Sequence, residues 1–258
     1  MNTSKNIGRS FIICMAMYSI IPMPMIEWEK KNMKYTMCFL PLIGGIIGAC
    51  MYGIYTVMGT FTENFQVIAL LFIPIILSGG IHMDGWLDTC DAYFSYGDKE
   101  KKLEILKDPR TGAFGVLGAI VYFMGLFAVF SQLIENGGTY FLAVSLVYII
   151  SRSVGALCMI LVPNARKGGL GASFSDASSQ RCVCYTLGIW LLSCVIALWM
   201  MDLYLCIIIL GTVFISLLVI LPMYMRKFGG ITGDLTGFLI CWLELVLPLS
   251  IGIGGMIL

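Results

Sequence analysis

Residues 203–225 read LYLCIIILGTVFISLLVILPMYM, a run that contains no charged side chain. It is long enough to cross a bilayer, because the hydrocarbon core takes about 20 residues of α-helix. Comparable apolar runs recur along the chain at 36–60, 65–80, 112–133, 139–162, 182–201 and 236–258. Lipid cannot satisfy open backbone groups, so each run is expected to be helical. The fold class predicted is an all-α polytopic membrane protein with about seven transmembrane helices.

The composition of the 258-residue chain agrees with this prediction and excludes other classes. Apolar residues make up 59% of it and charged residues 12%, whereas about a quarter of a soluble protein is charged. Disorder requires low hydrophobicity. The net charge of +1 is too small to attract nucleic acid. The apolar runs make the lipid bilayer the expected partner. An eighth apolar run, Ile7–Ile21, is short for a span and predicts an interfacial or re-entrant helix at the amino terminus.

The charged residues indicate an orientation. The connections 61–64, 134–138 and 202 contain acidic residues and no lysine or arginine. The other connections are basic, with Lys30, Lys31, Lys34, Lys99, Lys101, Lys102, Lys107, Arg110, Arg166, Lys167, Arg181, Arg226 and Lys227. The positive-inside rule places the basic connections in the cytoplasm. They are also the long ones, so an active site is expected in cytoplasmic loops of one domain, residues 1–258.

The richest of these loops begins with a run of aspartates. Asp84, Asp88 and Asp91 are spaced i, i+4 and i+7, which places them on one face of a helix. Carboxylates so close repel each other unless a cation lies between them. Mg²⁺ prefers oxygen ligands and usually bridges to substrate phosphates. The three aspartates are therefore interpreted as magnesium ligands. His82, the only histidine, could orient one of them or relay a proton.

Further candidates follow in the same loop. Lys99, Lys101 and Lys102 are interpreted as the solvated basic face of a surface helix. Lys107-Asp108-Pro109-Arg110-Thr111-Gly112 differs, because a turn that presents two bases and an acid at the start of a helix can bind an oxyanion.

Two more glycine-rich loops belong to the same face. Residues 163–171 combine Arg166 and Lys167 with three glycines, and residues 229–237 combine Asp234 with two threonines, including Thr232, and four glycines, including Gly233. Such loops allow a close approach of backbone amides to a phosphate.

Two charges lie inside apolar runs. An intramembrane charge suggests a function and needs a partner; Glu244 is the candidate partner of Arg152, and a purely structural ion pair is the alternative. Acidic metal ligands with cationic phosphate clamps predict metal-assisted transfer at a phosphate or pyrophosphate.

The motifs resemble a known family. GGIHMDGWLDTCDA (79–92) followed by KDPRTGAFG (107–115) resembles the signature of adenosylcobinamide-GDP ribazoletransferase, also called cobalamin synthase. IPMP (21–24) with PLIG (41–44), Ser151-Arg152 with 163–171, and 230–237 resemble its other patterns, so the resemblance covers nearly the whole chain.

The resemblance implies a reaction in vitamin B12 synthesis. A ribose hydroxyl of α-ribazole, or of its 5′-phosphate, would attack the pyrophosphate of adenosylcobinamide-GDP and release GMP, with Mg²⁺ as cofactor. It also implies a prokaryotic cytoplasmic membrane, with the active face cytoplasmic. The oligomeric state stays open, a homo-oligomer included.

Roles for the residues follow as hypotheses. Mg²⁺ would be held by Asp84, Asp88 and Asp91. The hydroxyl proton would be accepted by Asp108, Asp234 or His82. Phosphate oxygens would be bound by Lys107, Arg110, Arg152, Arg166, Thr232 and Gly233.

Other functions are less well supported by the sequence. A CDP-alcohol phosphatidyltransferase would need an aspartate where Ile81 stands, and a prenyltransferase would need a second aspartate-rich segment. A small-molecule transporter should show repeated halves with broken helices, and the sequence has none.

Overall fold

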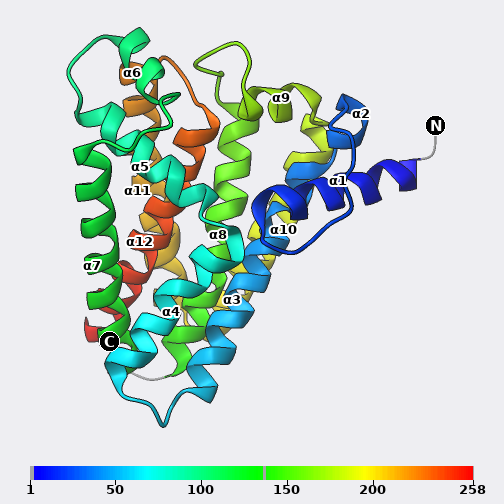
Figure 1. The fold of residues 1–258 in the computed structure, drawn as a ribbon. Coiled ribbons are helices and arrows are strands. Elements are labelled where there is room, and N and C mark those ends of the chain that lie inside the picture. Colours follow the sequence, from blue (N-terminus) through cyan, green and yellow to red (C-terminus); the bar gives the residue numbers. More distant parts are fainter. Residues whose placement is uncertain (1–2, 136–137, 258) are drawn as a thin grey trace.

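The computed structural model describes residues 3–135 and 138–257, and this part of the chain is helical without a strand (Figure 1). The helices in chain order are α1 (Thr3–Tyr18), α2 (Lys30–Met33), η1 (Thr36–Phe39, a 3-10 helix), α3 (Leu40–Val57), α4 (Glu63–Ser78), α5 (Ile81–Phe94), α6 (Lys99–Ile105), α7 (Ala113–Glu135), α8 (Gly138–Leu161), α9 (Leu170–Ala177), α10 (Gln180–Met201), α11 (Leu203–Lys227) and α12 (Gly233–Ile257).

The predicted class, a polytopic helical membrane protein, is confirmed. Within the described ranges, six helical stretches are long and apolar enough to cross a membrane: Lys30–Val57, which contains α2, η1 and α3, and the helices α7, α8, α10, α11 and α12. The remaining predicted run forms α4, which bends by 96° into α5. Gly79 and Gly80 form this bend with φ angles of 64° and 76°, in a region that only glycine adopts readily. Because of the bend, α5 is a short helix set across the bundle and not a span of its own.

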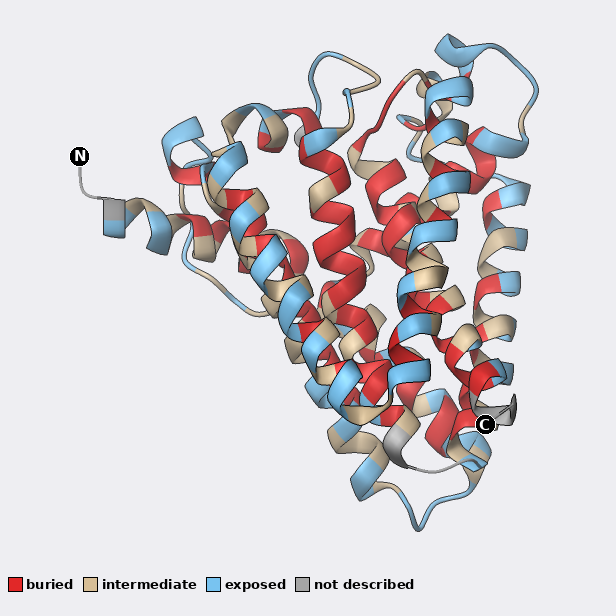
Figure 2. Ribbon diagram, turned by 180° about the vertical axis from the view of Figure 1, so that it is seen from behind, coloured by how far each residue is buried: buried red, intermediate tan, exposed pale blue. Residues whose placement is uncertain are grey.

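The core lies around α8 and α12. These two helices are mostly buried, whereas α7, α10 and α11 direct most of their apolar side chains outward, as Figure 2 shows for the outer helices. α3 packs closely on α8, because Gly44 and Gly48 remove the side chains that would separate them. A Cβ at Gly44 would lie 2.1 Å from the backbone oxygen of Tyr148, and one at Gly48 would lie 2.2 Å from that of Ser145. Small residues at helix crossings have this effect in membrane proteins.

The two ends of the bundle differ in structure. The connections 58–62 and 202 lie at one end, the lower end in Figure 1, and are short. The other end carries α6, α9 and the long loops and is called here the α6–α9 end. Near this end α1 runs outward from the flank of the bundle, with Lys5 and Ile7 exposed. This placement suits the interfacial helix expected at the amino terminus.

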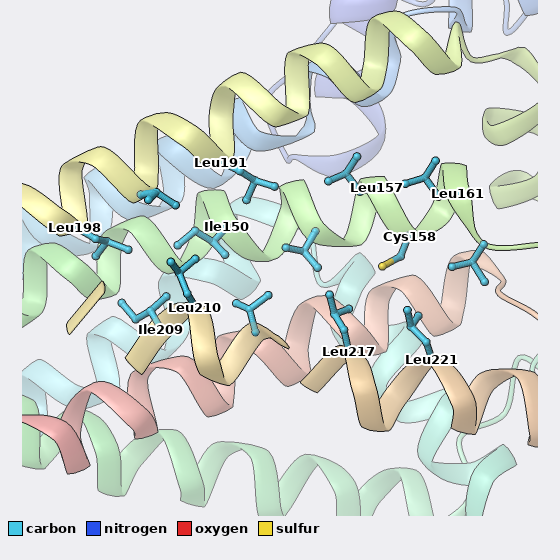
Figure 3. A pocket seen from close by; sticks show the side chains of 14 residues that line it. Ile150, Leu157, Cys158, Leu161, Leu191, Leu198, Ile209, Leu210, Leu217 and Leu221 are labelled. Carbon is cyan, nitrogen blue, oxygen red and sulfur yellow. The ribbon is translucent and has the colours of Figure 1, made fainter. Parts of the chain in front are cut away.

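A wholly apolar groove lies between the spans α8, α10 and α11 (Figure 3). It has a volume of about 400 Å³, and aliphatic side chains and Cys158 line it. No polar side chain of the described residues contributes to this lining, as expected for a groove at the depth of the lipid chains.

Candidate active site

The carboxylates of α5 differ in their surroundings although they share one helix face. Asp84 is exposed, Asp88 is half-buried and Asp91 is buried. α5 is fixed from its other face, where Trp86 stacks on Phe238 of α12 with ring centroids 4.7 Å apart. The face that carries the aspartates therefore runs from the surface into the protein.

Asp91 is engaged by the start of α7. Its two carboxylate oxygens accept hydrogen bonds from the backbone N–H groups of Gly112, at 2.7 Å, and Gly115, at 2.9 Å. The amino terminus of a helix attracts an anion through its free N–H groups and its dipole. Asp91 thus ties the loop before α7 to α5. Of the three expected magnesium ligands, Asp91 has both carboxylate oxygens engaged within the protein. Among the described residues, no group of three His, Cys, Asp or Glu residues is arranged to hold a metal ion.

Asp234 of α12 lies close to Asp84 and Asp88. The first turn of α12 crosses α5 at Gly85, where an added Cβ would lie 2.5 Å from the backbone oxygen of Asp234. Burial, followed by the charges of Asp84 and Asp234, raises the pKa of Asp88 to about 7. We call Asp84, Asp88 and Asp234 the carboxylate cluster.

The carboxylate cluster fits a magnesium ion that is shared with a substrate. Mg²⁺ is commonly bound through one or two carboxylates together with substrate phosphates and waters, and not by a complete protein cage. Three carboxylates gathered at one place supply the oxygen donors and the negative potential for such an ion. A complete set of ligands within the protein is not needed for this binding.

Arg166 brings a positive charge to the carboxylate cluster. Its Nη2 lies 3.4 Å from Oδ2 of Asp234, and its buried Nη1 has no hydrogen-bond partner among the described residues. Thr232 donates a hydrogen bond to Asp234 at 3.3 Å and accepts one from the backbone N–H of Leu235. Its hydroxyl therefore caps α12.

The two glycine-rich loops meet beside Arg166. The backbone N–H of Ile231 donates to the oxygen of Pro163, and that of Ala165 donates to the oxygen of Ile231, both at 2.9 Å. A Cβ at Gly171 would lie 2.8 Å from the backbone nitrogen of Gly233. The first turns of α9 and α12 therefore converge next to a guanidinium, an arrangement that suits an oxyanion.

The segment Lys107–Arg110 lies at the surface of the same end. Arg110 donates from Nε and Nη2 to the two oxygens of Asp108, at 2.9 and 2.8 Å. These hydrogen bonds lower the pKa of Asp108 to about 2. Lys107 is exposed. Asp108 is therefore a weak proton acceptor at neutral pH, and Arg110 must exchange its partner to bind a phosphate.

His82 lies inside the protein below the carboxylate cluster. It is 6% exposed and stacks on Tyr18 with centroids 5.7 Å apart. Its Nε2 is buried, and no residue in the part of the chain that the structure describes forms a hydrogen bond with it. Burial, and secondarily the charge of Arg152, keep its pKa well below the usual range. The imidazole is therefore neutral at physiological pH.

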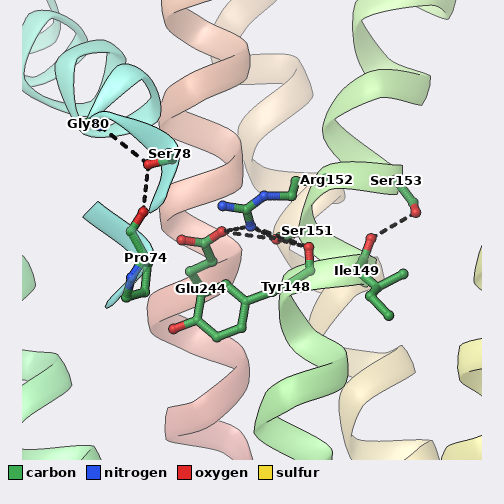
Figure 4. Close-up of polar contacts among 9 residues, drawn as sticks. All are labelled: Pro74, Ser78, Gly80, Tyr148, Ile149, Ser151, Arg152, Ser153 and Glu244. Atoms are coloured by element: carbon green, nitrogen blue, oxygen red, sulfur yellow. Dashed lines mark hydrogen bonds and ion pairs between the residues drawn. The ribbon is translucent and has the colours of Figure 1, made fainter. Parts of the chain in front are cut away.

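Arg152 forms a closed ion pair with Glu244 of α12 (Figure 4). Its Nη1 also contacts Ser151 and the backbone oxygen of Tyr148, and the residue is 1% exposed. The partner expected from the sequence is the one observed. The expected phosphate-binding role of Arg152 disagrees with this arrangement, because the guanidinium is enclosed and already neutralised.

The prediction that Lys102 belongs to a solvated basic face is wrong. The residue is only 4% exposed. Its Nζ donates to the backbone oxygens of Ala92, Tyr93 and Ser95, at 2.6, 2.9 and 2.6 Å. A lysine here satisfies the free carbonyl groups at the end of α5. The Ser95–Asp98 turn between two helices is the only signal in the sequence, and it does not specify which lysine turns inward.

Comparisons with known proteins match nearly the whole chain. Residues 10–252 match the family described as Cobalamin-5-phosphate synthase. An adenosylcobinamide-GDP ribazoletransferase of Lachnoclostridium phytofermentans is 36% identical over 244 residues, which cover 94% of this chain and 92% of the relative. Proteins of the same name from Clostridium botulinum and Treponema denticola are each 33% identical, over 91% and 92% of this chain and 93% and 95% of their own length. No solved structure matches.

Proposed function

The chain belongs to the cobalamin-5-phosphate synthase family, and from this premise we propose how its residues carry out the reaction. The activity is that of an adenosylcobinamide-GDP ribazoletransferase, which completes the nucleotide loop of cobalamin. The family assignment decides against a phosphatidyltransferase, a prenyltransferase or a transporter. The observation that carries the proposal is the meeting of the carboxylate cluster, Arg166 and two helix amino termini at the α6–α9 end.

The proposed reaction is an in-line displacement. The ribose hydroxyl of α-ribazole, or of its 5′-phosphate, forms a bond to the cobinamide-side phosphorus of adenosylcobinamide-GDP. The bond from that phosphorus to the bridging oxygen breaks, and GMP leaves with both bonding electrons. Charge on the phosphate oxygens must be neutralised as this happens.

The carboxylate cluster and Arg166 divide this task. Asp84 and Asp88 would hold Mg²⁺, which when bound neutralises the pyrophosphate and the leaving GMP. Arg166, with the amides at the starts of α9 and α12, would bind phosphate oxygens. Gly233 belongs to this set through its backbone, because it begins α12.

Asp234 is the proposed acceptor of the hydroxyl proton. It borders both Asp88 and Arg166, so it lies between the metal ligands and the phosphate clamp. Asp108 has a pKa of about 2, and His82 is enclosed below the site. Asp108 is therefore too weak a base for this role, and His82 is too deeply buried to reach the hydroxyl group.

We also propose that the α6–α9 end faces the cytoplasm of a prokaryotic cell. Except for Arg152 within α8, the basic residues that follow α1 lie in the connections and helix ends on this side of the bundle, as the positive-inside rule requires. The nucleotide substrate and its magnesium would then reach the site from the cytoplasm.

The test is release of GMP by purified protein in liposomes, with adenosylcobinamide-GDP and each form of the acceptor. We expect Asp84→Asn and Asp88→Asn to lower kcat by roughly a thousandfold or more, in the range of other losses of charge stabilisation. Asp176→Asn in α9 is the matched control, because Asp176 is an exposed aspartate of the same end, and it should keep full activity.

Binding of Mn²⁺, followed by electron paramagnetic resonance, separates the metal role from other causes of lost activity. Asp88→Asn should weaken this binding and Asp176→Asn should not. Wild-type affinity for Mn²⁺ in both Asp84→Asn and Asp88→Asn, or activity near wild type in either, would contradict the proposed metal site.

A further inference from the structure

A second cavity lies behind α5, on the side away from the carboxylates. It has a volume of about 550 Å³, within the range of about 300–1,000 Å³ that ligand pockets occupy. Its floor is formed by α5 and α12, including Trp86 and Phe238, and its walls by α7 and α11. Within the described residues, α7 and α11 do not pack extensively against each other, so the cavity is a cleft between them.

The cleft opens toward the hydrocarbon of the membrane. Val121 on one wall and Val219 on the other are 65% and 61% exposed, and both belong to transmembrane spans. The lining is aromatic and aliphatic and carries no lysine, arginine, aspartate or glutamate. Water would find few hydrogen-bond partners among such side chains. A lipid acyl chain, in contrast, would cover the apolar surface of the cleft and make van der Waals contacts with its walls.

The upper mouth of the cleft is basic. Val219 and Met223 line the cleft, and Arg226 and Lys227 follow one turn later on the same face of α11. Lys99 of α6 joins them, because its Cδ would lie 3.7 Å from a Cβ at Gly229. Burial and then the charge of Lys227 lower the pKa of Lys102, which is consistent with cations gathered at this end.

We propose that this cleft binds an anionic phospholipid, with one acyl chain between α7 and α11 and its phosphate against Arg226 and Lys227. The charge of the rim complements the headgroup, and the uncharged walls complement the chain. Because Trp86 and Cys90 of α5 form the floor, the bound chain supports the helix that carries Asp84 and Asp88 from behind.

The groove in Figure 3 provides an internal comparison. It is also apolar and also lies between spans. Its upper wall, however, ends at Leu221 on α11. Leu221 lies about 160° around that helix from Val219 and from Met223, because it is two residues away from each at about 100° per residue. That groove should therefore accept hydrocarbon without a preference for headgroup charge.

The test is native mass spectrometry of the full chain in detergent with dioleoyl phosphatidylglycerol or dioleoyl phosphatidylcholine, which share chains and differ in headgroup charge. Wild-type protein should retain one phosphatidylglycerol in preference to phosphatidylcholine. The double variant Arg226→Gln/Lys227→Gln should weaken phosphatidylglycerol binding by roughly tenfold or more and abolish the preference. Val219→Trp should reduce retention of the lipid by filling the cleft.

Matched controls lie elsewhere on the same protein. Arg181→Gln removes an exposed cation at the start of α10, and Leu210→Trp places an indole in the groove of Figure 3; both should keep the preference. Equal binding of the two lipids by wild-type protein, or an equal loss in Arg181→Gln, would overturn the proposal. Should Val219→Trp misfold, the exposed Arg226→Gln/Lys227→Gln variant still decides it, because unchanged binding there contradicts the headgroup contact.

Discussion

This protein contains two groups of closely spaced charged residues, and their charges are neutralised differently. Arg152 and Glu244 are buried in the bundle, and each is the other's counter-ion. In the carboxylate cluster of Asp84, Asp88 and Asp234, the one ion pair found among the described residues joins Asp234 to Arg166. A charge neutralised within the protein supports the fold, whereas a surplus of charge at an open end requires a cation or substrate from outside. The way in which the charges are neutralised therefore distinguishes the structural pair Arg152–Glu244 from the carboxylate cluster, which we propose as a binding site.

The largest change in stability is expected from breaking the closed pair. Glu244→Ala leaves the Arg152 guanidinium buried and unpaired, which should lower the free energy of unfolding by about 3–5 kcal/mol. Arg152→Met/Glu244→Leu replaces both charges by apolar side chains and should recover most of that loss. Thermal and denaturant unfolding in detergent measure both variants. A single variant as stable as wild type would show that the pair does not support the fold.

A smaller loss of stability is expected from replacing Asp91, which belongs to α5 but not to the carboxylate cluster. Asp91→Ala leaves the N–H groups of Gly112 and Gly115 without their acceptor, at a cost of about 1–3 kcal/mol in unfolding free energy. Because Asp91 is interpreted here as a positioning residue, the Mg²⁺ concentration for half-maximal activity should stay as in wild type. A rise in that concentration as large as in Asp88→Asn would return Asp91 to the metal ligands.

The smallest effect expected is a pH dependence of stability in the metal-free protein, caused by Asp88 of the carboxylate cluster. The folded pKa of Asp88, about 7, is above its usual value of 3.8, so the folded state retains a proton that the unfolded state releases. Wild-type stability should therefore fall as the pH rises from about 4 through 7. Asp88→Asn removes this dependence and should be more stable than wild type at pH 8 by roughly 1 kcal/mol, after allowance for solvent screening of a half-exposed group.

Unfolding in EDTA at pH 5 and pH 8 measures the difference. Parallel curves for the two proteins would mean that neither burial nor the neighbouring carboxylates raise the pKa of Asp88. Added Mg²⁺ should stabilise wild type at pH 8 and leave Asp88→Asn nearly unchanged, because the metal competes with the proton for the same oxygens.

The spans and much of the site could be predicted because each depends on a local pattern. The apolar runs at 203–225 and 182–201 became α11 and α10 with nearly the same bounds. Arg152 and Glu244 were expected to find each other because an intramembrane charge needs a partner. The spacing of Asp84 and Asp88 placed them on one face of α5.

The errors occurred where a distant segment decides the outcome. The spacing of Asp91 from Asp84 and Asp88 indicates a shared role, but the start of α7, 21 to 24 residues later, takes up its carboxylate. Lys101 and Lys102 are adjacent in the sequence, yet Lys101 pairs with Glu104 in solvent while Lys102 turns inward to the end of α5. Helix periodicity does not report the path of the following loop.

The amino-acid sequence by itself determined that the chain is a helical membrane protein, which loops are basic, and which residues carry charge, because hydrophobic run length and charge placement are properties of the chain alone. Only the tertiary structure decided which charges act together. The crossing of α5 and α12 at Gly85 brings Asp234 to Asp88, and the packing of α8 on α12 encloses Arg152 with Glu244. The energy of a charge depends on its distance from other charges and from water, and folding sets both distances.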